Sequence, residues 1–202
     1  MNQRFHNAFQ PDQSAVPKGL RIILPIQTRR LIITRFEPSM AAGVARLSWD
    51  AENRRFVPDE VFESEKDASQ CMAALIKAYD GEKGPFVFPV LKRENNALVG
   101  HVELSPLEND WEIGYHIGRE YRGNGYAAEA ARALSAAALD MLPAQRIIGV
   151  CLKDNIASAR TMENAGYTLR REKQGLYQGK PAQIRIYEYK KPAQPDASRP
   201  DL

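Results

Sequence analysis

Hydrophobic and polar residues alternate along three consecutive stretches in the middle of the chain. These stretches are FVFPVLKR (86–93), ALVGHVEL (97–104) and DWEIGYHIG (110–118), and short polar segments separate them. A period of two places successive side chains on opposite faces of a strand. Because the connecting segments are short, the three strands are predicted to form an antiparallel meander.

A helical period precedes the meander. Between Glu65 and Asp80 the hydrophobic positions recur every three or four residues, which defines one helix face: Ala68, Cys71, Met72, Leu75, Ile76 and Tyr79. Ser64 and Asp67 supply the S-x-x-D pattern of a capped helix start. Residues 38–49 are predicted to form an earlier helix, with Ser39 as its N-cap.

The pattern changes twice after the meander. The alanine-rich segment 126–142 is predicted to be a helix, and Pro143 stops it. RIIGVCL (146–152) is hydrophobic at nearly every position, which is typical of a central strand with both faces buried. A short helix is predicted from about Ile156 to Ala165, with Gly166 at the C′ position that favours glycine.

Further strands are predicted near both ends of the chain. Their segments are LRIIL (20–24), RLIITRF (30–36), YTLRREK (167–173) and AQIRIYEYKK (182–191), and the last two form a hairpin around GLYQGKP (175–181). This order of strands and helices predicts a single α/β domain with a mixed sheet.

Composition sets the limits of that domain. The chain has 202 residues, of which 44% are hydrophobic and 26% charged, as in an ordinary globular protein. The domain is expected to span residues 20–191. The end segments 1–19 and 192–202 are polar and contain prolines, so they are expected to be flexible.

Charge and cysteine content exclude several classes of protein. The net charge of +3 suits a phosphate-bearing ligand, but no stripe of Lys and Arg indicates a nucleic-acid partner. The N-terminal run RIILPI is too short for a signal peptide or a membrane span, so a cytoplasmic protein without a membrane partner is expected. Cys71 and Cys151 form no metal-ligand pair, and both are expected to be buried thiols.

Glycines stand at the start of the alanine-rich helix, in REYRGNGYAAEA (119–130). Gly123 and Gly125 let an anion approach the free N–H groups of the helix start, which can surround a pyrophosphate, and Arg122 adds a cation at the rim. The spacing also fits the dinucleotide fingerprint G-x-G-x-x-A. However, the preceding strand belongs to a meander and the next-strand carboxylate, Asp154, comes late, which disfavours an NAD-linked oxidoreductase.

Read as R-x-x-G-x-A, residues 122–127 resemble the acyl-CoA signature of the GNAT N-acetyltransferase superfamily. Three segments, in the same order, resemble the branch that contains the Rim-type ribosomal-protein N-terminal acetyltransferases: TRRLIITRF (28–36), WEIGYHIGREYRGNGYAAEA (111–130) and NIASARTMENAGY (155–167). The resemblance implies a mostly antiparallel mixed sheet of about seven strands with about four helices. It also implies a cleft, between strands splayed on either side of the glycine loop and its helix, that binds acetyl-CoA.

The resemblance extends to individual residues of the acetyl-CoA site. The loop and helix start would bind the pyrophosphate, Asn155 the pantetheine arm, and a backbone N–H near Ile117 the oxyanion. The cofactor-binding residues expected are therefore Ile117, Arg122, Gly123, Asn124, Gly125, Tyr126, Ala127, Asn155 and Ser158. No metal is expected.

Acetyl transfer to an amine also needs a base and a group that accommodates the leaving thiolate. Strand alternation puts Glu112, Gly114 and His116 on one face and Trp111, Ile113, Tyr115 and Ile117 on the other. Glu112 is the first candidate base, and Glu103 on the neighbouring strand is the second. Many superfamily members carry a tyrosine acid where this chain has Met162, so Ser158 is expected to serve the thiolate, as in the Rim-type branch.

These residues predict an acetyl-CoA-dependent N-acetyltransferase that transfers the acetyl group directly in a ternary complex. The favoured acceptor is a protein N-terminal α-amine. Alternatives are a small amine or amine-bearing antibiotic as acceptor, or a non-catalytic CoA-binding domain that has lost the acid. Acceptor specificity is expected to reside in residues 49–62, in the early helices and in the 175–181 turn. A monomer or homodimer is expected.

Overall fold

The computed structural model describes residues 24–80, 84–107, 110–142 and 144–190. The end segments expected to be flexible, Pro143, and nearly all of the strand expected at 20–24 lie outside these ranges. The described residues contain eight strands: β1 (Ile26–Gln27), β2 (Leu31–Ile33), β3 (Phe86–Lys92), β4 (Leu98–Leu107), β5 (Asp110–Ile117), β6 (Ile147–Leu152), β7 (Thr168–Tyr177) and β8 (Lys180–Tyr189). They also contain five α-helices: α1 (Ala41–Ser48), α2 (Ala51–Phe56), α3 (Glu65–Ala78), α4 (Tyr126–Met141) and α5 (Ile156–Asn164).

The eight strands form one mixed sheet in the order β1-β2-β3-β4-β5-β6-β8-β7. Neighbouring strands are antiparallel except for β5 and β6, which are parallel. The predicted meander is confirmed by the antiparallel pairing of β3, β4 and β5. The sheet has one strand more than the expected number of about seven, and the fold class is the one predicted.

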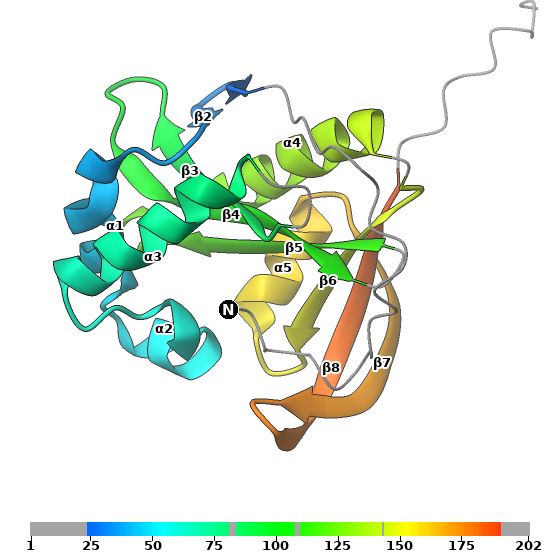
Figure 1. The fold of residues 1–202 in the computed structure, drawn as a ribbon. Helices are drawn as coiled ribbons and strands as arrows, with labels where there is room; N and C mark the ends of the chain where they lie inside the picture. The colour runs from blue at the N-terminus through cyan, green and yellow to red at the C-terminus, as the bar shows by residue number, and fades with distance from the viewer. Residues whose placement is uncertain (1–23, 81–83, 108–109, 143, 191–202) are drawn as a thin grey trace, which may run out of the picture.

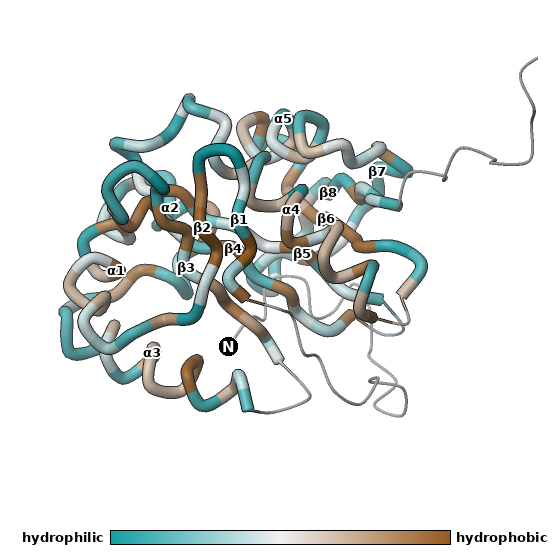
Figure 2. Tube along the Cα trace, turned by 90° about the horizontal axis from the view of Figure 1, so that it is seen from above, coloured by the Kyte–Doolittle hydropathy of each residue, from teal (hydrophilic) through white to brown (hydrophobic). Residues whose placement is uncertain are grey.

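Helices cover both faces of the sheet (Figure 1). α1 packs against α3 and β4 on one face, whereas α4 contacts β5 and β2 on the other and also packs against α5. In Figure 2, β2 is among the most hydrophobic segments. Because both layers bury apolar side chains against the sheet, the core continues through it, and fully buried residues such as Leu134, Leu104 and Ile147 belong to it.

Local signals explain several helix boundaries. α3 begins as predicted, because the Ser64 side chain accepts a hydrogen bond from the Asp67 N–H. α5 ends before Gly166, whose φ of 91° is the left-handed conformation expected at C′. The prediction for Ser39 is wrong: Pro38 starts a 3-10 turn that contains Ser39, and Met40 occupies the N-cap position of α1.

Two further expectations are corrected. Cys71 is exposed, because it lies on the flank of α3 while Ala68 and Met72 face the core; Cys151 is buried as expected. The hairpin strands β7 and β8 extend through most of the segment expected to be a loop, and only Gln178 and Gly179 separate them. In addition, residues 49–62 contain the helix α2, which the sequence pattern did not indicate.

Candidate active site

The parallel strands β5 and β6 pair over only part of their length. Their register joins Trp111 with Ile147, Glu112 with Ile148, and Ile113 with Gly149. Beyond these positions β5 continues to Ile117 and β6 to Leu152, while β6 remains paired with β8 through Leu152. The two strands therefore diverge, and a wedge opens between Gly114–Ile117 on one side and Val150–Leu152 on the other.

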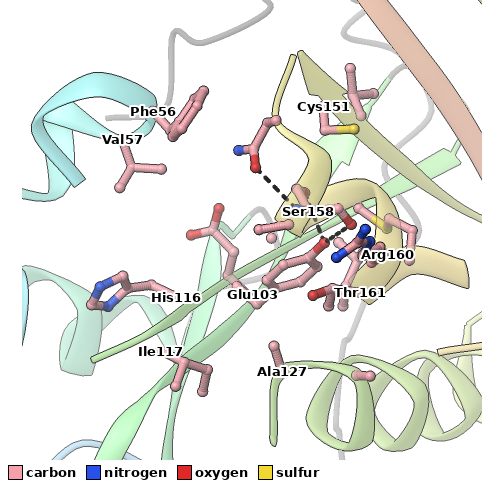
Figure 3. Close-up of a pocket in the computed structure, with 18 of the residues that line it drawn as sticks. Phe56, Val57, Glu103, His116, Ile117, Ala127, Cys151, Ser158, Arg160 and Thr161 are labelled. Carbon is pink, nitrogen blue, oxygen red and sulfur yellow. Dashed lines mark hydrogen bonds between the residues drawn. The ribbon is translucent and has the colours of Figure 1, made fainter. Parts of the chain in front are cut away.

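A cavity of about 580 Å³ occupies this wedge and reaches both faces of the sheet. On the α4 and α5 side it is lined by Gly123, Gly125, Ala127, Asn155 and Ser158. On the α2 side it is lined by Asn53, Phe56, Glu103, Glu112 and His116. Figure 3 shows Phe56 and Val57 across the cavity from Ser158 and Thr161, with the Glu103 side chain extending between them. One passage thus joins the helix-start loop to a carboxylate on the opposite face.

The loop before α4 has the backbone of an anion-binding nest. Gly123 and Gly125 have φ values of 78° and 77°, and Gly125 is the N-cap residue of α4. Among the described residues, no acceptor receives a hydrogen bond from the N–H groups of residues 123–128. A Cβ at Gly123 would meet no atom within 4 Å, so the space beside the loop is open. Free N–H groups at the positive end of a 16-residue helix favour an anion there.

Arg30, in the turn between β1 and β2, is a cation at this loop that the sequence pattern did not reveal. Its Nη1 donates to the Asn124 carbonyl at 2.9 Å, and its Nε donates to Glu129 at 2.7 Å. Its guanidinium also lies 4.8 Å from the centre of the Tyr126 ring. Arg30 is far from the loop in sequence, so only the sheet topology could have placed it there.

Arg122 points away from the nest. Its Nε donates to the Ile117 carbonyl at 2.9 Å, and its Nη2 donates to Asp50 at 2.8 Å and to Asn53 at 3.0 Å. Its Nη1 donates to Glu52 at 2.5 Å. The rim cation expected from the sequence is therefore engaged with the first turn of α2. The other two loop residues of the expected set, Tyr126 and Ala127, start α4 and line the cavity.

Ile117 presents its backbone to the wedge. Gly118 donates its N–H to Val99 of β4 at 2.9 Å, and Gly100 faces Ile117 in the register. In an antiparallel pair, residues flanking a hydrogen-bonded position direct their N–H and C=O groups the other way. The Ile117 N–H therefore points away from β4, toward the gap left by β6, where an oxyanion donor is expected.

The face that carries Glu103 and Glu112 is the one opposite α4 and α5. Glu103 faces Gly114 across the β4–β5 pair, and Glu112 faces Ser105. Glu103 is 6% exposed, and a Cβ at Gly114 would overlap its carboxylate. Glu112 also pairs with Ile148 in the joined part of the wedge, whereas Gly114 lies where the strands separate. Glu103 is therefore better placed than Glu112 to reach the open end.

A group of polar side chains surrounds these carboxylates. His116 and His101 have ring centres 5.4 Å apart, and His101 lies 3.2 Å from Glu60. The Ser105 hydroxyl is buried and has no hydrogen-bond partner within the described ranges. A buried hydroxyl in this condition can hydrogen-bond a ligand that enters the cavity.

Ser158 lies on the other side of the wedge in a defined hydrogen-bond arrangement. Asn155 caps α5 by accepting the Ser158 N–H at 3.0 Å. The Ser158 hydroxyl is 2.9 Å from the hydroxyl of Tyr115, which also donates to the Ser158 carbonyl at 3.0 Å. Burial raises the pKa of Tyr115, so this phenol stays protonated at neutral pH and can donate a hydrogen bond.

Tyr115 was not among the site residues expected from the sequence, although it lines the cavity and contacts Ser158. Alternation placed it in the same row as Trp111 and Ile113, which read as core. The available signal was a phenol in an otherwise apolar row, close to the end of the strand that leads into the glycine loop. Met162, at the position of the expected tyrosine acid, packs against Gly149 and is 1% exposed. Cys151 is also buried, and burial raises its pKa to about 11, so it is poorly suited as a nucleophile.

α2 closes one side of the cavity and is held at both ends. Asp50 caps its first turn by accepting the N–H groups of Glu52 and Asn53. At its other end, Tyr177 of the β7–β8 hairpin donates to the Phe56 carbonyl at 2.5 Å. Arg55 also pairs with Asp154, at the start of the α5 segment, at 2.6 Å. The segment predicted to determine acceptor specificity is thus a wall of the cavity.

A cleft between strands splayed beside a glycine-rich helix start is the arrangement that the resemblance to the GNAT N-acetyltransferases implied. The chain belongs to this family, because the family model described as "Acetyltransferase (GNAT) domain" matches residues 30–168. It is an N-acetyltransferase by this membership. Within the described ranges, no helix is long and apolar enough to cross a membrane, and no group of three or more His, Cys, Asp or Glu could hold a metal ion.

Similar proteins agree with this assignment. A Bacillus subtilis (strain 168) protein described as "Uncharacterized N-acetyltransferase YnaD" is 33% identical over 149 residues, which are 73% of this chain and 83% of that protein. The structure of an acetyltransferase (GNAT family) from Bacillus anthracis has a TM-score of 0.70 and 26% identity, and the match covers 82% of this chain and 97% of that one. A putative ribosomal-protein-serine acetyltransferase from Vibrio cholerae has the same fold, with a TM-score of 0.69 and 23% identity over 84% and 100% of the two chains.

Proposed function

We propose that this protein transfers the acetyl group of acetyl-CoA to a primary amine, foremost a protein N-terminal α-amine, in a ternary complex. The observation that carries the proposal is the passage between β5 and β6. It joins a loop with free N–H groups on one face of the sheet to a buried carboxylate on the other. Donor and acceptor can therefore approach one gap from opposite faces without passing each other.

The residues of the loop fit the pyrophosphate of acetyl-CoA. Two left-handed glycines expose successive N–H groups, and the open space at Gly123 leaves room for phosphate oxygens. Arg30 holds a guanidinium beside the loop, where it contacts the Asn124 carbonyl and pairs with Glu129. Asn155 and the small side chain of Ala127 line the path from the loop to the wedge, where the pantetheine arm would lie.

In the reaction, the amine nitrogen bonds to the thioester carbon and the carbon–sulfur bond then breaks. The Ile117 N–H is the proposed donor to the oxyanion of the tetrahedral intermediate. We assign the base to Glu103, which would take the proton of the amine directly or through water. This choice reverses the order of Glu103 and Glu112 expected from the sequence, because Gly114, opposite Glu103, lies where the strands part.

The leaving thiolate would be met by the hydroxyls of Ser158 and Tyr115. They lie 2.9 Å apart, so the tyrosine can orient or polarise the serine hydroxyl, or donate to the sulfur itself. Burial raises the pKa of Tyr115, so the phenol stays protonated, and it would have to turn its one proton from the Ser158 carbonyl to the sulfur to hydrogen-bond the thiolate. This pair would replace the tyrosine acid whose position holds Met162.

The α-amine acceptor is supported by the Rim-type resemblance of the sequence and by the fold shared with the Vibrio cholerae protein. The chemistry on the acceptor side is also suitable. Glu103 and Glu112 line it, and carboxylates attract an amine that arrives protonated. The unpartnered hydroxyl of Ser105 could hydrogen-bond the first peptide group of such an acceptor.

A panel of acceptors tests the proposal. The protein is mixed with acetyl-CoA and, separately, with peptides of differing first residue, the same peptides blocked at the α-amine but containing lysine, and small amines including aminoglycosides. Free thiol and product mass are measured. We expect thiol release with α-amine peptides. Transfer to small amines alone would show that the acceptor is a small amine and not a protein N-terminus. No transfer despite CoA binding would indicate a non-catalytic CoA-binding domain.

A further inference from the structure

Arg122 links two parts of the site that are far apart in sequence. Its backbone belongs to the loop proposed to bind pyrophosphate, but its guanidinium reaches the first turn of α2. There it donates to Asp50, Glu52 and Asn53, at distances of 2.5–3.0 Å. The Asp50 side chain is only 7% exposed, so this ion pair is shielded from water more than an ordinary surface pair.

These contacts fix the orientation of Asn53, which is itself 3% exposed. The Asn53 carbonyl oxygen accepts from Arg122, so its amide nitrogen must point the other way. That nitrogen lies 3.0 Å from the Ser48 carbonyl and 2.7 Å from His116 Nε2. His116 Nε2 is therefore the acceptor of this bond. A continuous set of hydrogen bonds therefore runs from Arg122 through Asn53 to His116, which lines the cavity on the α2 side, where the amine would enter.

We propose that Arg122 is a positioning residue for the amine acceptor: it holds α2, with Asn53 and Phe56, against the wedge. This inference rests on the acetyl transfer proposed above. Arg30 is the other guanidinium at this loop: it contacts the Asn124 carbonyl and pairs with a single carboxylate, Glu129. The geometry favours a positioning role for Arg122 over phosphate binding, because its nitrogens already donate to acceptors on β5 and at the start of α2. Two carboxylates, Asp50 and Glu52, neutralise its charge.

The proposal separates acceptor binding from donor binding in an Arg122→Gln variant. The CoA Kd, measured by calorimetry, should stay within about twofold of the unmodified protein. The amine KM should rise by about tenfold or more, as for the loss of charge-assisted hydrogen bonds in a shielded site, with a smaller change in kcat. Backbone hydrogen exchange in residues 51–56 should become faster. Arg122→Lys, which keeps the charge but not the fork of donors, should restore the amine KM only in part.

Two further variants sharpen the test. Asp50→Asn keeps a side chain that caps helices well but removes the charge that Arg122 contacts, so it should raise the amine KM by itself. Combined with Arg122→Gln, it should add little, because both changes remove one interaction. Arg46→Gln, which removes a cation from an exposed pair with Glu120, is the matched control and should change neither constant.

The outcomes are distinct. A CoA Kd raised tenfold in Arg122→Gln, an amine KM that does not change, or additive effects in the double variant would overturn the positioning role. If Arg122→Gln does not fold, Asp50→Asn alone decides, through the amine KM. If the unmodified protein transfers no acetyl group, the proposed function fails, while hydrogen exchange in α2 and the CoA Kd still test whether Arg122 holds α2 or binds phosphate.

Discussion

At the scale of single residues, the site depends on contacts between side chains far apart in sequence. The N-x-x-S pattern pointed to Asn155 and Ser158, which both line the cavity, since both positions are local to one helix start. It could not identify Tyr115, because the 2.9 Å contact with Ser158 exists only when β5 lies beside α5. Likewise, alternation placed Glu103 and Glu112 near the cleft. Which of the two is the better candidate base depends on where β5 and β6 separate, and no local sequence pattern marks that point.

The hydroxyl pair gives the first prediction. Ser158→Ala and Tyr115→Phe should each lower kcat by roughly 10²-fold, the size expected for a positioned proton donor, with little change in the acetyl-CoA Kd. The double variant should lose little more than either single variant, because the two hydroxyls act as a unit. Single-turnover kinetics measure this cycle. If Ser158→Ala kept full turnover and lost only about 1 kcal/mol of stability, the serine would be part of the helix start alone.

The two carboxylates form a matched pair for the second prediction. A free α-amine has a pKa of about 7.7–8.0, so it is largely protonated below pH 7 and arrives neutral at higher pH. Glu103→Gln should therefore lower kcat/KM most below pH 7 and recover in part as the pH rises. Glu112→Gln should have the smaller effect at every pH. If Glu112→Gln lowered kcat/KM more than Glu103→Gln below pH 7, Glu112 would be the base instead. If Glu103→Gln lowered kcat/KM equally at every pH, Glu103 would bind the substrate rather than take its proton.

At the scale of elements, the loop before α4 was the most predictable part of the site. Glycine spacing, the preceding strand and the alanine-rich helix are all local, and the structure has both glycines in the left-handed conformation. α2 was the least predictable element. It has six residues and no hydrophobic period, and it is held by Asp50, Arg122 and Tyr177 rather than by a core-facing stripe. Interactions of that kind belong to the tertiary structure.

A comparison of two glycines tests the nest. Gly123 and Gly179 have φ values of 78° and 74°, and neither has an atom within 4 Å of its missing Cβ. Valine at either position should cost about the same backbone strain, on the order of 1–2 kcal/mol. Only Gly123→Val should also weaken CoA binding, by tenfold or more, because its side chain would occupy the space for phosphate. Denaturant unfolding and calorimetry measure the two effects, and equal CoA affinities in two folded variants would contradict the nest assignment.

At the scale of the whole molecule, the account depends on the wedge between β5 and β6. The order of elements predicted the antiparallel meander, the central strand and the hairpin, since each has a hydrophobic period of its own. Strand register, the extension of β7 to Tyr177 and the point where β5 and β6 diverge were not predictable, because pairing between strands sets them. The same divergence creates the passage that separates donor from acceptor, so the function proposed for the chain rests on its topology.

The most direct test is an experimental structure of the protein with bound CoA. The account predicts the pyrophosphate on the N–H groups of residues 123–127 and the pantetheine arm between β5 and β6. Its sulfur should lie near the hydroxyls of Ser158 and Tyr115, with Glu103 across the gap. CoA bound at another surface, or a β5–β6 gap filled by protein side chains while CoA is bound elsewhere, would contradict it.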